Sequence, residues 1–328
     1  MMKTYNIAIL GAGHIAEKMA HTLQQMPRAN SYAVASRSLE KAQQFAQRWG
    51  FSKAYGSYTD MLADPAIDLV YVATPHAMHY SHVLQCLQAG KAVLCEKAFT
   101  CNAREAEALI HEAEARKLLL AEAIWTRYLP LMQTVKQLVN SGIIGQPRTL
   151  TANLSYPISH KERIQRPNLG GGALLDIGVY TLNFAAMLFG TDIKKIDSCC
   201  EKTPSGMDAQ DSITLWYNDG KMAQLSSSIY VRSDRMGIIS GTEGHIIVEN
   251  VNNPSRLTVV NNQYQAIKKC EAPVQITGFE YEVEACLNAL DHHCIEPSYM
   301  PHAETLRMMR LMDTLRQQWG VRFPNDEA

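Results

Sequence analysis

The feature that most constrains this chain of 328 residues is a glycine pattern directly after its first apolar run. Residues 5–10 predict a buried strand, and residues 15–25 have the apolar spacing of a helix. Between them stand Gly11, Gly13 and Ala16, at the spacing G-x-G-x-x-A. A strand, a glycine turn and a helix in this order are typical of the first βαβ unit of a dinucleotide-binding domain.

Each residue of this pattern has a physical function in such a unit. Gly11 permits the tight turn, Gly13 lets the main chain approach a pyrophosphate, and Ala16 lets the helix pack close to the sheet. His14 and Ile15 open the helix, whose first N–H groups and dipole favour phosphate. We therefore expect a dinucleotide to bind at this turn.

The first third of the chain alternates short apolar runs with amphipathic stretches, which predicts right-handed βαβ units and a parallel sheet. Asn102 is a candidate N-cap for the last of these helices. The expected strands are 5–10, 32–35, 69–72, 92–95 and 118–121, and the expected helices are 15–25, 39–49, 79–89 and 102–116.

The pattern then changes to strands separated by Gly and Asn turns, which predicts an antiparallel sheet. The expected strands are 148–156, 194–201, 211–217, 223–230, 236–240, 245–249 and 257–260, with helices at 173–189, 280–290 and 303–319. A chain of this length exceeds one hydrophobic core. We predict a Rossmann domain, a doubly wound α/β sheet, over residues 1–122. An α+β domain with a large, mostly antiparallel sheet would follow over residues 123–328, for substrate binding and oligomerisation.

Composition excludes several classes of partner. Lys and Arg number 31 against 32 Asp and Glu, for a formal net charge of −1, which disfavours nucleic acid and anionic membranes as partners. Residues 6–10 are too short for a signal peptide, and no run approaches the length of a membrane-spanning helix. None of the eight cysteines forms a C-x-x-C pair. These features indicate a cytoplasmic protein with reduced thiols and no zinc module.

The end of the second predicted strand bears on the choice of nicotinamide cofactor. An NAD site usually has an acidic residue there, which bonds the ribose 2′-hydroxyl. This chain has Ser36 and Arg37 instead, with Lys41 one turn later. A guanidinium suits a 2′-phosphate in both charge and geometry. The sequence therefore favours NADP(H) and leaves NAD(H) open.

Four further segments carry a resemblance to a known family. Glu96-Lys97-Ala98 follows the strand at 92–95, and Thr74-Pro75 is followed by His76 and His79. Together with residues 121–128 and 170–180, these segments resemble the Gfo/Idh/MocA oxidoreductases, most closely the dimeric dihydrodiol dehydrogenase branch. The resemblance implies a two-domain oligomer that oxidises trans-dihydrodiols of arenes, and certain sugars, with NADP.

The resemblance also implies functions for individual residues. The family's Glu-Lys-Pro signature has Ala98 in place of proline here, which leaves the rigidity of that turn open. Where many relatives carry Asp-x-x-x-His, this chain has Asp176 and Tyr180, the variant of the dihydrodiol branch. Residues implied to lie at the cofactor are Thr74, Pro75, His76, His79, Glu96 and Lys97.

Oxidation of an alcohol requires a hydride acceptor and a group that removes the hydroxyl proton. Lys97 would stand at the carboxyl end of a strand, where open α/β sheets bind ligands. Burial and a positive nicotinamide would make it a better proton acceptor. Tyr180 can share the same oxygen, and Asp176 lies one helical turn earlier, where it would bind a substrate hydroxyl or tune Lys97. We predict a relay that contains Lys97 and Tyr180, without deciding which takes the proton.

For the other candidate residues, a purely structural role is the alternative to a functional one. Histidines at 76, 79 and 82 share a helix face, but no carboxylate or thiolate completes a metal site, so no metal is predicted. Trp125, Arg127, Tyr156 and His160 are candidates for the substrate pocket, with ordinary packing as the alternative for Tyr156 and His160.

The resulting functional hypothesis is an NADP-preferring dehydrogenase or reductase for a polyol, a sugar or a cyclic trans-diol. A non-catalytic NAD(P)-binding regulator of the same fold is the alternative, disfavoured by the presence of both Lys97 and Tyr180. We also expect a homodimer or larger homo-oligomer, because an apolar outer face of the second sheet would need a cover.

Overall fold

The computed structural model describes residues 3–326. They divide into two compact units. One holds the residues up to Ile124 together with Gln275–Leu306, and the other holds Trp125–Val274 together with the residues from Arg307 onward.

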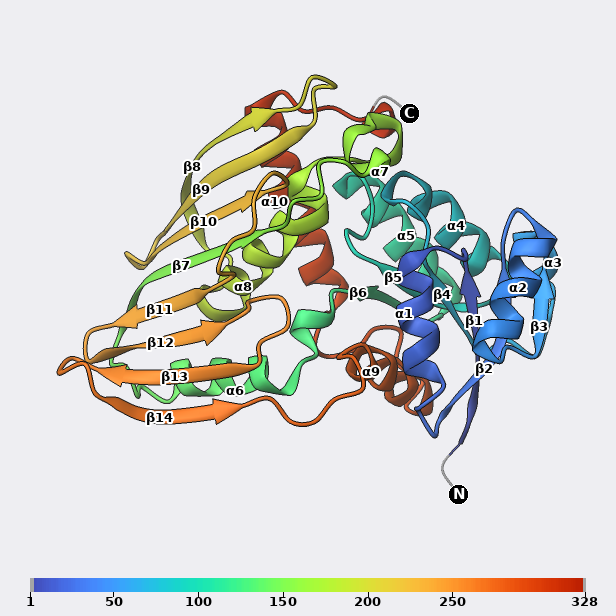
Figure 1. The fold of residues 1–328 in the computed structure, drawn as a ribbon, viewed down its shortest axis with the longest axis horizontal. Helices are drawn as coiled ribbons and strands as arrows, with labels where there is room; N and C mark the ends of the chain where they lie inside the picture. Colours follow the sequence, from blue (N-terminus) through green and yellow to red (C-terminus); the bar gives the residue numbers. More distant parts are fainter. Residues whose placement is uncertain (1–2, 327–328) are drawn as a thin grey trace. The chain divides into compact units, whose positions relative to one another are not determined.

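The first unit is built on a parallel sheet with the strand order β3-β2-β1-β4-β5-β6 (Figure 1). Its strands are β1 (Tyr5–Leu10), β2 (Ala29–Ala35), β3 (Lys53–Tyr55), β4 (Leu69–Val72), β5 (Ala92–Glu96) and β6 (Leu120–Ala123). The order reverses between β1 and β4, the place where sheets of this kind bind ligands at the carboxyl ends of their strands. The predicted Rossmann architecture is confirmed.

Helices cover this sheet, and local signals begin several of them. Asn102 caps its helix by accepting the main-chain N–H of Glu105 at 2.9 Å, as predicted. Ser38 does the same for Lys41 at 3.3 Å. The helices are α1 (His14–Leu23), α2 (Leu39–Trp49), α3 (Tyr58–Leu62), α4 (His76–Gln88), α5 (Ala103–Arg116) and α9 (Glu280–Asp291).

The sequence-based division at residue 122 needs one correction, because Gln275–Leu306 belongs to the first unit. Arg28 binds Glu284 and Asn288 of α9 at 2.5 and 2.8 Å. The N–H of Leu120 in β6 donates to the carbonyl of Ile295 at 2.9 Å. Periodicity identifies α9 as a helix, but it does not show to which sheet the chain returns.

The second unit contains an eight-stranded sheet in the order β14-β13-β12-β11-β7-β10-β9-β8. Only β10 and β7 pair in parallel, so the predicted mostly antiparallel sheet is confirmed. Its strands are β7 (Pro147–Ser155), β8 (Ile193–Lys202), β9 (Asp208–Tyr217), β10 (Met222–Ser228), β11 (Gly237–Gly241), β12 (Gly244–Glu249), β13 (Arg256–Asn261) and β14 (Ala266–Glu271).

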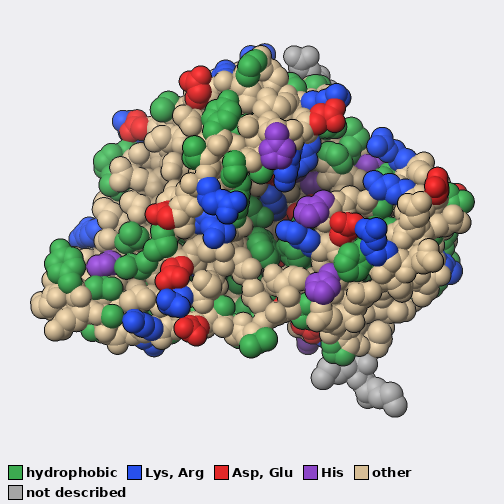
Figure 2. Space-filling view, viewed as in Figure 1, with side chains coloured by type: hydrophobic (Ala, Val, Ile, Leu, Met, Phe, Trp, Pro, Cys, Tyr) green, Lys and Arg blue, Asp and Glu red, His purple; other side chains and the backbone are tan. Residues whose placement is uncertain are grey.

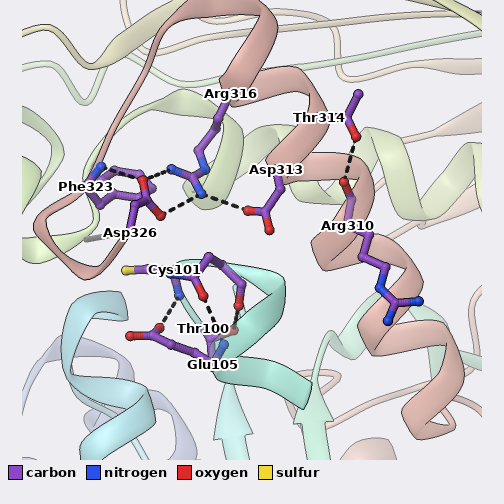
Figure 3. A network of polar contacts seen from close by, with 10 residues as sticks. Thr100, Cys101, Glu105, Arg310, Asp313, Thr314, Arg316, Phe323 and Asp326 are labelled. Atoms are coloured by element: carbon purple, nitrogen blue, oxygen red, sulfur yellow. Dashed lines mark hydrogen bonds and ion pairs between the residues drawn. The ribbon is translucent and has the colours of Figure 1, made fainter. Parts of the chain in front are cut away.

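Helices α6 (Pro130–Asn140) and α8 (Val179–Phe189) and the π-helical turn η3 (Leu174–Gly178) lie against one face of this sheet (Figure 1). The other helical segments are η1 (Trp125–Arg127), α7 (Glu162–Gln165), η2 (Pro167–Leu169), η4 (Pro324–Asp326) and α10 (His302–Trp319), of which the residues from Arg307 onward belong to this unit. At the end of α10, Arg316 binds Asp313 at 2.8 Å and Asp326 at 2.7 Å, which fixes η4 (Figure 3). The same guanidinium lies 4.5 Å from the centre of the Phe323 ring.

The opposite face of this sheet differs from the expected apolar surface. Gln210, Ser212, Gln224 and Ser226 of β9 and β10 are exposed, with Trp216 beside them. An antiparallel sheet can leave one face polar while the other is buried. Figure 2 likewise shows hydrophobic side chains in small groups among polar atoms on the face drawn there.

The sequence did not predict β3, α3, α6 or β14. The helix predicted at 79–89 begins three residues earlier, at His76, because Pro75 occupies its N-cap position. The strand predicted at 118–121 lies two residues later, at Leu120–Ala123. Strands as short as β3, with three residues, carry too little periodicity to identify.

The expectation that no stretch is long enough to cross a membrane was wrong by length and composition. Pro167–Phe189 spans 23 residues with a mean hydropathy of 1.5 in its most apolar window. However, 78% of that window is buried inside the protein, as in a core helix. Among the residues described, none of the eight cysteines forms a disulfide.

Candidate active site

The turn between β1 and α1 has the geometry that its glycines predict. Gly11 has a φ of +104°, and a Cβ there would lie 2.9 Å from the carbonyl oxygen of Ala73. Gly13 is the N-cap of α1, has open space where a Cβ would stand, and supplies no side-chain cap. The first N–H groups of α1 therefore lie beside a glycine that has no side chain in the way, which leaves room for the pyrophosphate of a dinucleotide.

The carboxyl end of β2 places Arg37 near Tyr58, which the sequence did not predict, and near His82, which was considered only as a metal ligand. The rings of Tyr58 and His82 meet edge to face, with their centres 4.9 Å apart. Burial, with His79 and Arg37 nearby, lowers the pKa of His82 to about 4, so it is neutral at neutral pH. His82 Nδ1 also lies 3.0 Å from Thr74 Oγ1. Ser36 is buried, and Arg37 itself is exposed.

Lys97 follows β5 in a turn whose main chain is held on both sides. Its N–H donates to Glu96 Oε2 at 3.1 Å, and its carbonyl oxygen lies 3.2 Å from His76 Nε2. The peptide bond between Lys97 and Ala98 is cis, and Ala98 is fully buried. The contacts of Glu96 and His76 with this main chain are present although proline is absent.

His79 fixes the same turn from the first helical turn of α4. Its Nδ1 lies 2.9 Å from the carbonyl oxygen of Ala98 and 3.2 Å from that of Phe99. Its Nε2 lies 2.8 Å from the carbonyl oxygen of Thr74. Burial outweighs these carbonyls and lowers the pKa of His79 below its ordinary value. Both ring nitrogens face main-chain oxygens, and residues 3–326 contain no group of three side chains placed to hold a metal.

In the second unit, Asp176 is part of an ion pair that the sequence did not predict. Arg163 of α7 donates to both carboxylate oxygens of Asp176, at 2.7 and 3.1 Å. Asp176 is 8% exposed and lies in the π-helical turn η3, and Tyr180, also 8% exposed, lies in the first turn of α8. Short π-helical turns occur frequently at functional sites. Their spacing of four residues is compatible with the predicted placement of both side chains on one face of the helix.

The helix that carries these two residues begins at a buried carboxylate. Asp208 of β9 accepts the N–H of Leu174 at 2.5 Å. A Cβ on Gly172 would lie 2.2 Å from Asp208 Oδ1, so glycine is required where this carboxylate approaches the turn. Burial raises the pKa of Asp208 to about 6. Asp208 therefore positions the start of η3.

The remaining predicted substrate residues lie around the end of β7 and η1. Arg127 is 5% exposed, and its Nε donates to Asn183 of α8 at 2.6 Å, which ties η1 to that helix. Tyr156 is half-buried, and its hydroxyl donates to Asn252 Oδ1 at 3.4 Å. Trp125 is half-buried, whereas His160 is exposed in the loop before α7.

A second buried carboxylate of β9 gives a pH-dependent prediction. Burial raises the pKa of Asp211 from 3.8 to about 7, against the hydrogen bonds that it accepts from Ser227. Because the folded-state pKa is raised, this group favours the folded state below about pH 4, and that contribution is lost as pH rises to about 7.

Asp211→Asn should therefore match the parent near pH 4 and exceed its unfolding free energy by about 4 kcal/mol near pH 8. Urea unfolding at both pH values measures the difference. A variant that is equally destabilised at both pH values would contradict the argument.

The residues that the sequence did not identify have partners that are distant in sequence or belong to a different helix or strand. Arg163 precedes its partner Asp176 by 13 positions, and nothing in its polar segment distinguishes it from a surface arginine. Tyr71 of β4, discussed below, reads only as a core strand residue. Asp208 bonds a main-chain N–H that sequence alone does not place near it.

Comparison with known proteins agrees with this geometry. The family "Oxidoreductase family, NAD-binding Rossmann fold" matches residues 5–123, and the "GFO/IDH/MocA C-terminal domain" matches residues 132–247. Trans-1,2-dihydrobenzene-1,2-diol dehydrogenase of Mus musculus is 33% identical over 332 residues, with 97% of this chain and 98% of that protein covered. The Xenopus tropicalis protein of the same name is 34% identical over 324 residues, with 96% and 98% covered.

Solved structures share the fold over nearly the whole chain. A 3-ketoreductase from Actinomadura kijaniata, in complex with NADP and TDP-benzene, has a TM-score of 0.87 at 25% identity, covering 96% of this chain and 98% of that chain. A levoglucosan dehydrogenase in complex with NADH and levoglucosan has a TM-score of 0.87 at 18% identity, with 97% of each chain covered. The chain therefore belongs to the Gfo/Idh/MocA family and is an NAD(P)-binding oxidoreductase.

Proposed function

We propose that this enzyme transfers hydride between NADP(H) and a hydroxyl or carbonyl carbon of a cyclic trans-diol, a sugar or a polyol. The observation that carries the proposal is the 33% identity, over almost the whole of both chains, to a trans-1,2-dihydrobenzene-1,2-diol dehydrogenase. The conformation of the Lys97 turn supports it, because a catalytic side chain requires a fixed main chain.

In this proposal Lys97 and Tyr180 move the proton of the reacting hydroxyl. When bound, the nicotinamide supplies the hydride acceptor or donor. Lys97 Nζ removes the hydroxyl proton as the hydride leaves, and returns it when a carbonyl is reduced. Tyr180 shares the same substrate oxygen through its hydroxyl. Asp176, held by Arg163, offers a carboxylate of fixed orientation to a second substrate hydroxyl.

The side chains implied for substrate contact would give such a pocket an aromatic wall and several polar groups. Trp125 and Tyr156 are half-buried, and His160 is exposed. Rings of this kind cover the apolar face of a cyclic substrate, and polar groups orient its hydroxyls. Arg127 acts on this pocket by fixing η1 through Asn183.

Arg37 is the proposed determinant of NADP preference, with Lys41 at the start of α2 as a second cation. Arg37→Ala should raise the KM for NADP+ by about tenfold to a hundredfold and leave the KM for NAD+ within about twofold, because only NADP+ carries the 2′-phosphate. Steady-state kinetics with both cofactors measures this. An equal loss with NAD+ would show that Arg37 contributes to general folding or binding instead.

We also propose a homodimer formed through the outer face of the second sheet. The exposed residues of β9 and β10 on that face are mostly uncharged, and Trp216 is 41% exposed among them. Interfaces are depleted in charge and enriched in aromatic residues at their cores. Light scattering of the purified protein tests the proposal, and a mass of one chain would contradict it.

The experiment that tests the proposed function is a panel assay of the purified protein. NADP+ and NAD+ are each offered with arene trans-dihydrodiols, aldoses and inositols, and formation of reduced cofactor is followed by absorbance. Turnover of one class, faster with NADP+, is the expected result. Tight NADPH binding without turnover of any substrate would contradict the proposal and favour a regulator that only binds the cofactor.

A further inference from the structure

We propose that Tyr71 is a positioning residue, which acts through Glu96 to hold Lys97 in its reactive orientation. The inference rests on the proposed function of Lys97, but it concerns a side chain in a different strand that touches neither cofactor nor substrate in that proposal. All of the contacts that support it lie within the first unit.

The contacts form one chain from β4 to the Lys97 turn. The hydroxyl of Tyr71 donates to Oε1 of Glu96, and Oε2 of the same carboxylate accepts the N–H of Lys97 at 3.1 Å. Because the two carboxylate oxygens belong to one rigid plane, the phenol sets the rotation of that plane. The plane in turn sets where the N–H of Lys97 points.

The other side of Lys97 is held independently. Its carbonyl oxygen lies 3.2 Å from His76 Nε2, and the next carbonyl, that of Ala98, lies 2.9 Å from His79 Nδ1. With the main chain fixed before and after its Cα, the direction of the Cα–Cβ bond, from which the Lys97 side chain extends, is fixed too. Tyr71 is the member of this arrangement that the family signature of the turn does not include.

Burial explains why the donor should be a tyrosine. Tyr71 is 1% exposed and Glu96 6% exposed, so the carboxylate needs donors from the protein. Burial and the nearby Glu96 and Glu282 raise the pKa of Tyr71 well above its ordinary value. The phenol therefore keeps its proton and always donates.

Among the buried carboxylates near the Lys97 turn, Glu96 accepts a hydrogen bond from the main chain of the turn itself. Glu282 of α9 is fully buried, and neither of its carboxylate oxygens has a hydrogen-bond partner among the residues described. Burial and Glu96 raise its pKa well above the usual range, so it is neutral. Burial and Glu96, with Glu122 of β6 also nearby, raise the pKa of the Cys95 thiol in β5, and Glu280 of α9 adds to the raised pKa of Glu282.

The test compares Tyr71→Phe with a matched control, Tyr5→Phe. Tyr5 is a buried strand tyrosine of the same unit whose hydroxyl donates to a carboxylate, Asp291 Oδ1, at 2.6 Å. Both variants lose one phenol–carboxylate bond. We expect kcat to fall by about tenfold in Tyr71→Phe with KM values within about twofold, and neither to change in Tyr5→Phe.

A pH profile separates positioning from general destabilisation. Loss of the phenol removes a bond to the charged form of Glu96, so the pKa of that carboxyl rises and the acidic fall of kcat moves to higher pH in Tyr71→Phe alone. A merely structural role would lower kcat without moving the profile. Equal behaviour of the two variants would overturn the proposal.

A second readout does not depend on turnover. Lysines are labelled by reductive ¹³C-methylation, and the Lys97 signal is identified by its loss in Lys97→Met. We expect Tyr71→Phe to shift that signal and Tyr5→Phe to leave it in place. An unmoved Lys97 signal would overturn the positioning proposal even if no substrate is found. A moved signal with no turnover on any substrate would leave positioning intact and count against the proposed function.

Discussion

Lys97→Met is expected to lower kcat by about 10³-fold, while the affinity for NADPH changes by no more than about threefold. Methionine keeps the length and the apolar stem of the side chain but carries no proton acceptor. The main-chain contacts of residue 97, through Glu96 and His76, do not involve the side chain and should persist. The loss should therefore fall on the proton-transfer step and not on the fold of the turn.

Steady-state kinetics gives kcat, and quenching or enhancement of NADPH fluorescence gives the affinity. Lys136→Met is a matched control, because Lys136 is an exposed lysine of α6 outside the proposed site. It should leave both quantities unchanged. If Lys97→Met retained more than about a tenth of the parent kcat, Lys97 would not be the main proton acceptor, and Tyr180 would take its place.

The parts of the site that the sequence predicted are those set by local physics. Gly11 has a φ of +104°, which favours glycine, and Asn102 caps the helix that begins at the next residue, so both follow from local sequence. Arg37 was predicted from its place after a strand, because parallel strands present their carboxyl ends at one edge.

The parts that could not be predicted depend on contacts between distant segments. Arg163 and Asp176 come together only because α7 folds back onto η3, and α9 returns to the first unit after the whole second sheet. Tyr71 contacts Glu96 because β4 and β5 are neighbours in register, which the sequence suggests only when the full strand order is known. Alternation of hydrophobic residues carries no such pairing information.

Gly172→Ala is expected to destabilise the second unit by about 3 kcal/mol or more, because two penalties coincide. The φ of Gly172 is +102°, which an alanine rarely adopts, and its Cβ would lie 2.2 Å from Asp208 Oδ1. Asp208 cannot withdraw freely, since it accepts the N–H of Leu174 at the start of η3. The substitution should therefore disturb the segment that carries Asp176 and Tyr180 as well as the stability of the fold.

Gly190→Ala separates the two penalties. Gly190 follows α8 with a φ of +78° and a ψ of −159°, and nothing lies within 4 Å of the position of its Cβ, so its cost should be the backbone strain alone, about 1–3 kcal/mol. Urea unfolding measures both variants. The decisive comparison is Gly172→Ala in an Asp208→Ala background, where the clash is absent. There the glycine substitution should cost no more than Gly190→Ala does, and an undiminished cost would show that Asp208 is not what makes glycine necessary.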